Sequence, residues 1–251
     1  MSRLSAGLVL AVLFLACLVA SAPARLLGMV LPETAIILQG YGGTIWCGRA
    51  SQALLATQSG YIHLGAVHWS LKPLSLLTLS PFFEVDSSWG NQRLSGGVRI
   101  SADDNIELKN LDAAFSAQLL RQFLPLAVGG EFFVQLANLQ LHRGLPTAVQ
   151  GRIVWQHATW ESSQGALALG TYALELEQQA GGALKGTIVT IAGGVVANGD
   201  ASLDGDRYSV NILVTDDAGL DSQLGQALSL IAQPVADGYR IAFEGQLSGP
   251  Q

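Results

Sequence analysis

The chain has 251 residues, of which 49% are hydrophobic. Only 13% are charged, against about 25% in ordinary soluble domains. The net charge is −6 and the 13 Lys and Arg residues do not cluster, which excludes a basic patch for nucleic acid or for lipid headgroups. The 29 glycines, together with frequent Val, Ile and Thr, favour strands and turns over surface helices.

An apolar run at the N-terminus, Ala6 to Ala20, directs the chain out of the cytoplasm. Its length lies between that of a signal-peptide core, about 7–15 residues, and that of a membrane-spanning helix, about 17–25. Arg3 precedes the run, and positive charge stays on the cytoplasmic side. Ala22-Pro23-Ala24 fits signal peptidase, so cleavage after Ala22 or Ala24 is the alternative. We expect a cytoplasmic tip (1–4), a membrane anchor or uncleaved signal (5–24) and a periplasmic β-rich domain (25–251).

Beyond residue 30, apolar and polar side chains alternate, which is the pattern of a strand with one buried face. The clearest runs are Tyr172, Leu174 and Leu176; Tyr208, Val210, Ile212 and Val214; and Tyr239, Ile241 and Phe243. Turns are predicted at Gly193-Gly194, Asn198-Gly199 and Asp204-Gly205. The apolar phase slips between Leu136 and Leu139, which predicts a β-bulge near Ala137-Asn138.

Two segments repeat apolar residues at every fourth position, the spacing of an amphipathic helix. They are Leu111, Phe115, Leu119 and Phe123, and Leu220, Leu224, Leu228 and Ile231. Asn110 is placed to cap the first helix, and Pro125 and Pro234 close the two.

One constant shift along the chain relates its two halves. It carries Gly42 to Gly151, Trp46 to Trp155, Gly96 to Gly205 and Leu111 to Leu220. We predict half-repeats at approximately 36–142 and 145–251, each a strand meander with one short helix. The fold class is therefore mainly β: a twisted antiparallel sheet built from two related half-domains, preceded by an N-terminal membrane helix.

No pattern for catalysis, a cofactor or a metal is present. On a strand His63 and His68 point to opposite faces, and the sequence has no HExxH or CxxC pair. GxGxxG, P-loop and GxSxG motifs are also missing. We predict a non-enzymatic protein without catalytic, cofactor-binding or metal-binding residues. The tryptophans are expected to pack in the core or on strand faces, and Cys47 to be a small buried hydrophobe.

Gly43 to Ala50 (Gly-Thr-Ile-Trp-Cys-Gly-Arg-Ala) resembles the G-T-x-W-x-G-x-A signature of the general secretion pathway protein N family of bacterial type II secretion systems. Trp69 to Pro73 resembles its W-x-L-x-P element, Gly151 to Trp155 its second G-x-(V)-x-W strand, and Leu169 to Tyr172 its L-G-x-Y. Cys47 stands at a variable position of the signature, where a cysteine is not expected. The motif residues, and candidate interface, are Gly43, Thr44, Trp46, Gly48, Trp69, Pro73, Gly151, Trp155, Gly170 and Tyr172.

The resemblance implies an accessory inner-membrane component of type II secretion, with its C-terminal domain in the periplasm and no enzymatic activity or cofactor. Its expected partners are other secretion subunits, on the inner-membrane platform or the secretin side, and the inner membrane itself through the N-terminal helix. A sheet edge or the Trp46/Trp69 region is the expected contact surface. The alternative is a groove for lipid or another hydrophobic ligand, because the repeat pattern distantly resembles AsmA-like proteins.

Overall fold

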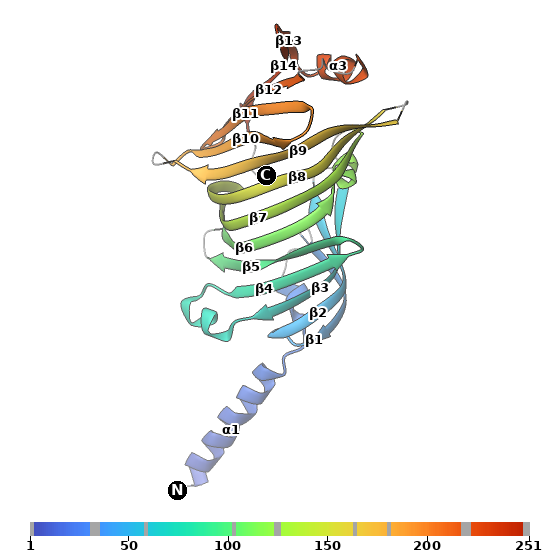
Figure 1. Cartoon of the computed structure of the whole chain (residues 1–251). Helices are drawn as coiled ribbons and strands as arrows, with labels where there is room; N and C mark the ends of the chain where they lie inside the picture. Colours follow the sequence, from blue (N-terminus) through green and yellow to red (C-terminus); the bar gives the residue numbers. More distant parts are fainter. Residues whose placement is uncertain are drawn as a thin grey trace. The chain divides into compact units, whose positions relative to one another are not determined.

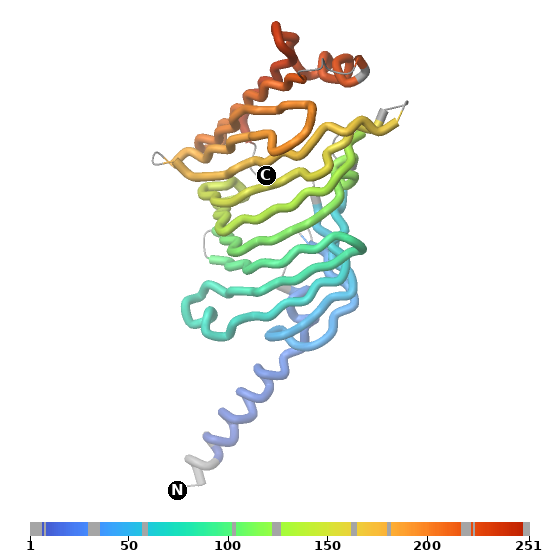
Figure 2. Tube along the Cα trace, in the orientation of Figure 1, coloured from blue at the N-terminus to red at the C-terminus, as the bar shows by residue number. Residues whose placement is uncertain are grey.

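The structure, a computed structural model, describes residues 3–30, 36–57, 60–101, 104–122, 127–162, 165–179, 182–216 and 222–247. Antiparallel strands dominate this part of the chain, which confirms the prediction of a mainly β fold (Figures 1 and 2). The chain divides into two compact units, Met1–Gly90 and Asn91–Gln251.

In the described residues, the first unit is a meander in which each strand pairs antiparallel with the next. Its core contains the buried residues Ala24, Ala50, Ala53, Val67 and Trp69. Its elements are α1 (Arg3–Ala20), α2 (Leu26–Val30), β1 (Ile36–Gly43), β2 (Cys47–Thr57), β3 (Gly60–Leu71), the 3-10 helix η1 (Pro73–Thr78) and β4 (Phe82–Trp89).

Helix α1 presents apolar side chains on all sides. It is rich in Leu and Ala, which are strong helix formers, and all side chains from residue 9 to residue 20 are exposed. Leu10 and Phe14, for example, are 71% and 67% exposed. In Figure 1 the helix projects away from the strands of its unit. Among the described residues, no helix combines the length and the apolar character needed to cross a membrane.

The second unit is also a meander, with every neighbouring pair of its described strands antiparallel. Its strand order follows the sequence until the end, where β14 lies between β12 and β13. Its elements are β5 (Gln92–Ser101), β6 (Asn105–Ser116), the 3-10 helix η2 (Ala117–Gln122), β7 (Val128–His142), β8 (Leu145–Ser162), β9 (Gly165–Gln178), β10 (Leu184–Ala192), β11 (Val195–Asp204), β12 (Arg207–Asp216), α3 (Ser222–Ser229), β13 (Gln233–Val235) and β14 (Gly238–Gln246).

The three strands predicted from alternation are confirmed as β9, β12 and β14. The turn at 193–194 is confirmed. The turn predicted at 204–205 lies one residue later, at Gly205-Asp206, between Asp204 and Arg207, which pair across a tight hairpin. The bulge is also confirmed, because the register of β7 against β8 shifts between Leu136 and Asn138.

The turn predicted at Asn198-Gly199 is wrong, since both residues lie inside β11. Gly199 serves a different purpose there. A Cβ at this position would lie 2.7 Å from the Cα of Ile212 on β12. The glycine therefore allows two backbones to approach closely within the sheet instead of reversing the chain.

The first predicted helix is also wrong. Leu111 and Phe115 lie on strand β6, and Leu119 lies in η2, while Phe123 and Pro125 fall outside the described residues. A spacing of four fits a strand as well as a helix, because it is a multiple of the strand period of two. Ala113 fills the intermediate position and is buried. Asn110 does not cap a helix; it lies within β6 with φ +48°.

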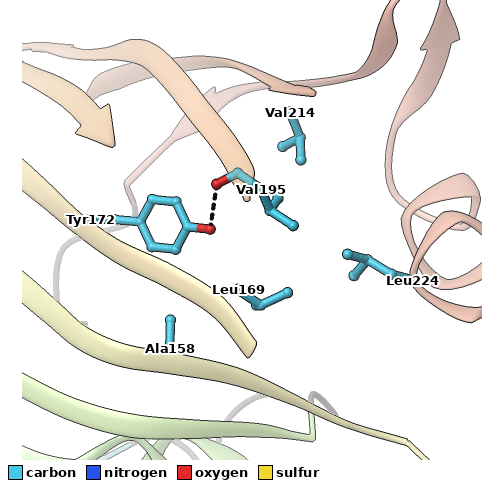
Figure 3. Close-up of a cluster of buried hydrophobic side chains, with 6 residues drawn as sticks. All are labelled: Ala158, Leu169, Tyr172, Val195, Val214 and Leu224. Carbon is cyan, nitrogen blue, oxygen red and sulfur yellow. Dashed lines mark hydrogen bonds between the residues drawn. The ribbon is translucent and has the colours of Figure 1, made fainter. Parts of the chain in front are cut away.

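The second predicted helix is confirmed over Ser222–Ser229. Leu220 lies outside the described residues, and Ile231 lies beyond the end of the helix. Leu224 of α3 is buried in a cluster with Leu169, Val195 and Val214, which come from the sheet (Figure 3).

The half-repeats at 36–142 and 145–251 stay a prediction. The constant shift joins positions with different local structure. Trp155 lies within β8, whereas Trp46 lies in the turn after β1, which ends at Gly43. The sequence pattern predicted one continuous strand from Gly42 to Trp46. This prediction is wrong, because the strand ends at Gly43.

Candidate functional site: the junction between the N-terminal helix and the sheet

The segment that follows α1 is hydrogen-bonded to the turn between β1 and β2. The Ala24 amide donates to the Gly43 carbonyl at 3.1 Å, and the Ile45 amide donates to the Ala22 carbonyl at 2.9 Å. Pro23 and Thr44 thereby form an isolated antiparallel bridge. The Ala24 side chain is 2% exposed and belongs to the core of the first unit. Residues 22–24 are thus part of the fold.

Trp46 connects this turn to the end of the helix. Its indole Nε1 donates to the Val19 carbonyl at 2.8 Å. The last carbonyls of a helix have no partner within the helix, so the indole acts as a C-terminal cap. The ring also forms an open apolar groove with side chains of α1, namely Val12, Leu15, Ala16, Val19 and Ala20.

Gly43 and Thr44 give the turn its shape. Gly43 has φ +81°, a conformation that disfavours residues with a Cβ. Thr44 closes the turn twice: its amide donates to the Cys47 carbonyl at 3.1 Å, and its hydroxyl accepts from the Cys47 amide at 3.2 Å. The Gly-Thr pair therefore fixes the path of the chain from β1 into β2.

Trp69 packs against the same turn and forms a hydrogen bond with it. It is 6% exposed, and its Nε1 donates to the Ile45 carbonyl at 3.2 Å. Gly48 makes room for the ring: a Cβ there would collide with the indole and lie 2.6 Å from the Thr44 carbonyl oxygen. Burial leaves little of Trp69 for a partner, whereas Trp46 is only half-buried.

Pro73 lies just beyond this cluster. The Leu71 amide donates to the Trp46 carbonyl at 2.8 Å, so β3 ends against the turn. Pro73 then begins η1, where its fixed φ suits the first helical position. Six of the motif residues, from Gly43 to Pro73, thus gather at one end of the first unit.

The other four motif residues lie in the second unit. Trp155 and Tyr172 are direct cross-strand partners on β8 and β9, with ring centroids 5.8 Å apart. Phe132 stacks on the other side of Trp155 at 5.4 Å, and Phe115 stacks on Phe132 at 5.4 Å. The Trp155 Nε1 donates to the Gly129 carbonyl at 3.0 Å. These rings form an aromatic row across four neighbouring strands.

Tyr172 is anchored at the end of this row. Its hydroxyl donates to the Val195 carbonyl at 2.8 Å (Figure 3). Burial, and to a smaller extent the negative charge of Asp216, raises the pKa of Tyr172 to about 12.

Gly151 and Gly170 lie against the backbone of neighbouring strands. A Cβ on Gly151 would collide with the Gln135 carbonyl, and a Cβ on Gly170 would collide with the Ala192 carbonyl. The four motif residues of the second unit, Gly151, Trp155, Gly170 and Tyr172, therefore have a packing role.

Two features of the junction were not predicted. The pairing of residues 22–24 with the turn joins segments far apart in sequence, and no periodicity signals it. Cys47 is exposed, so the prediction that it is buried is wrong. Cys47 is the first residue of β2, and its side chain lies on the solvent-exposed side of the strand.

Among the described residues, no group of three or more His, Cys, Asp or Glu side chains is arranged to hold a metal ion.

The fold and the junction define a class of protein: two units that are each an antiparallel β meander, the first with an N-terminal apolar helix joined to its sheet by a Gly-Thr-x-Trp turn. The family model described as type II secretion system (T2SS), protein N, matches residues 34–242, and the chain belongs to this family. Membership implies a role in type II secretion and contact with other secretion subunits.

Two curated relatives carry the name type II secretion system protein N. The one from Vibrio cholerae serotype O1 is 32% identical over 262 residues, covering 96% of this chain and 97% of the relative. The one from Klebsiella pneumoniae is 27% identical over 216 residues, covering 84% of this chain and 82% of the relative. No solved structure matches the chain.

Proposed function

We propose that the chain is a non-enzymatic adaptor of type II secretion, held at the bacterial inner membrane by α1. In this role the β-rich domain lies in the periplasm and binds other secretion subunits. Arg3 before the apolar run supports this orientation. The exposed apolar surface of α1 supports contact with lipid, since such a surface is unfavourable in water.

The observation that carries the proposal is the junction. An export signal that is removed after translocation has no need of specific contacts with the mature domain. Here the helix end is capped by Trp46, and Ala22 and Ala24 exchange backbone hydrogen bonds with the turn. Specific hydrogen bonds therefore join the end of the helix to the sheet of the first unit, which suits a permanent anchor.

Two exposed features of the first unit suit a partner. Strand β1 pairs with β2 on one side, and an edge strand offers backbone groups to an added strand. Gln39 is exposed on β1, and Cys47 is exposed beside Trp46. Their positions make both residues suitable for crosslinking without disturbing the core.

Crosslinking in cells tests the adaptor function. A photo-crosslinking residue at Gln39, and a thiol crosslinker on Cys47 in a Cys17→Ala chain, are expected to capture a type II secretion subunit. The matched control is the same photo-crosslinker at Asp206, an exposed hairpin residue of the second unit. Capture of the same abundant bystanders from all three positions would refute the proposed contact surface.

A second function, binding of lipid chains, is favoured by one face of the second unit. Ala113, Val134, Ile153 and Leu174 are successive cross-strand partners, and they lie next to the aromatic row on the same face. Val134, Ile153 and Leu174 are only half-buried.

Mass spectrometry of the purified full chain tests whether it binds lipid chains. Ile153→Gln is expected to lower the phospholipid that copurifies, whereas Arg152→Gln, on the opposite face, leaves it unchanged. Equal lipid in all three proteins would contradict it.

A further inference from the structure

The segment between β3 and β4 carries leucines that nothing covers. Leu74, Leu77 and Leu79 are 79%, 81% and 86% exposed, and no residue of η1 is buried. From Pro73 to Pro81 the sequence contains no charged residue. We call residues 73–79 the leucine loop. An exposed cluster of large apolar side chains marks a site of interaction with a protein or a membrane.

Both hydroxyl groups of the leucine loop and several of its backbone groups are hydrogen-bonded within the loop or to the residues that flank it. The Ser75 hydroxyl donates to the Lys72 carbonyl at 2.6 Å and accepts from the Phe82 amide at 2.8 Å. The Thr78 hydroxyl donates to the Ser75 carbonyl at 2.8 Å, and the Leu79 amide donates to the Leu76 carbonyl at 3.1 Å. A loop that enters lipid must satisfy its backbone in this way, because lipid supplies no hydrogen bonds.

The leucine loop leaves the sheet at the end where α1 joins it. Leu71, two residues before the loop begins, donates its amide to the Trp46 carbonyl, and Trp46 caps α1 at Val19. At the base of the loop, Lys72 forms an ion pair with Glu84 at 2.6 Å. The loop is thus short, and these contacts hold its base close to the point where the chain meets its helix.

We propose that the leucine loop inserts into the surface of the phospholipid bilayer beside α1, as a second membrane contact. The proposal rests on the membrane anchor proposed above. It takes the bilayer as the occupant because the loop is uncharged, exposes three leucines and has hydrogen-bonded hydroxyl groups, and because it adjoins the anchor. Two contact points at one end of the unit would hold the sheet in a fixed orientation, which a single helix does not do.

Fluorescence in vesicles tests this proposal on the full chain. The protein is reconstituted into phosphatidylethanolamine and phosphatidylglycerol vesicles with an environment-sensitive label at Leu77→Cys or Leu74→Cys, in a Cys17→Ala and Cys47→Ser background. A label on native Cys17, with Cys47→Ser, reports on α1. The control is Tyr61→Cys: Tyr61 is 53% exposed near the other end of β3, roughly 30 Å along the strand from Leu71.

Blue-shifted emission and quenching by brominated lipid at both leucine positions and at Cys17, but not at Tyr61, are expected. Labels at 74 and 77 that remain as water-exposed as the label at 61, with Cys17 in lipid, would overturn the loop insertion and leave the anchor standing. The loop would then be a candidate surface for a protein partner. A water-exposed label at Cys17 would refute the anchor and, with it, the insertion that rests on it.

Discussion

At the residue scale, the signature is a packing solution rather than a set of reactive groups. Each motif residue at the junction has a distinct physical role, since Gly43 turns the chain, Thr44 closes the turn, and Trp46 caps the helix. Gly48 and Trp69 fit together only because one of them lacks a side chain. The sequence shows such residues as a motif, but their roles become visible only when the turn, the helix end and β3 are seen together.

Gly48→Ala tests this fit. The added methyl group meets the Trp69 ring and the Thr44 carbonyl, so the variant is expected to lose about 2 kcal/mol of unfolding free energy. Urea denaturation followed by tryptophan fluorescence measures the loss. Gly194→Ala is the matched control, because a Cβ there meets only Asp216, at 4.0 Å. If both variants unfold at the same urea concentration as the parent chain, the packing account of Gly48 is wrong.

Tyr172 gives a prediction for alkaline pH. Its pKa of about 12 in the folded chain exceeds the value of about 10 in an unfolded chain. Below pH 10 the phenol is protonated in both states, so it causes no pH dependence. Between pH 10 and 12 the unfolded state loses this proton first, and the folded state is therefore destabilised as the pH rises.

Tyr172→Phe is expected to reduce this alkaline loss of stability. At neutral pH the variant should lose about 1 kcal/mol, because the Val195 carbonyl loses its hydrogen bond. Urea unfolding at several pH values measures both effects. Tyr61→Phe, at an exposed position, should change neither. An alkaline decline as steep in Tyr172→Phe as in the parent would show that other groups cause it.

At the element scale, the cap on α1 joins the helix to the sheet of the first unit. Replacing Trp46 by Phe keeps an aromatic ring in the groove but removes the N–H that binds the Val19 carbonyl. The bond is solvent-accessible, so we expect a loss of only about 0.5 kcal/mol. We also expect faster trypsin cleavage in detergent after Arg25, which is exposed next to the junction.

Trp89→Phe provides the control for this measurement, since Trp89 is 50% exposed and stacks on His63 away from the junction. Equal cleavage rates at Arg25 in the two variants would mean that Trp46 does not hold the helix end.

Sequence patterns predicted some elements correctly and others wrongly. Alternation located β9, β12 and β14 because each has one buried face. The fourfold spacing of Leu111 and Phe115 misled because it suits both a strand and a helix, and buried Ala113 hid the alternation between them. Asn198-Gly199 was mistaken for a turn because close strand packing also selects glycine. Neither ambiguity can be resolved without knowing which strands are neighbours.

At the scale of the whole chain, motif order was more informative than any single motif. The order of the G-T-x-W, W-x-L-x-P, G-x-x-x-W and L-G-x-Y elements indicated the protein N family, and the family match confirms it. The candidate site was only partly predictable. Its motif residues were identified, but the pairing of Ala22–Ala24 with the turn depends on a long-range contact that no local pattern encodes.

The proposed anchor requires that the N-terminal segment is a retained part of the folded protein. The most direct test is the intact mass of the chain extracted from bacterial membranes, combined with protease treatment of spheroplasts. A retained anchor gives a full-length mass and a domain that is digested from the outside. A mass that shows cleavage after Ala22 or Ala24 would contradict it, because such a cut would remove α1 and break the segment that pairs with Gly43 and Ile45.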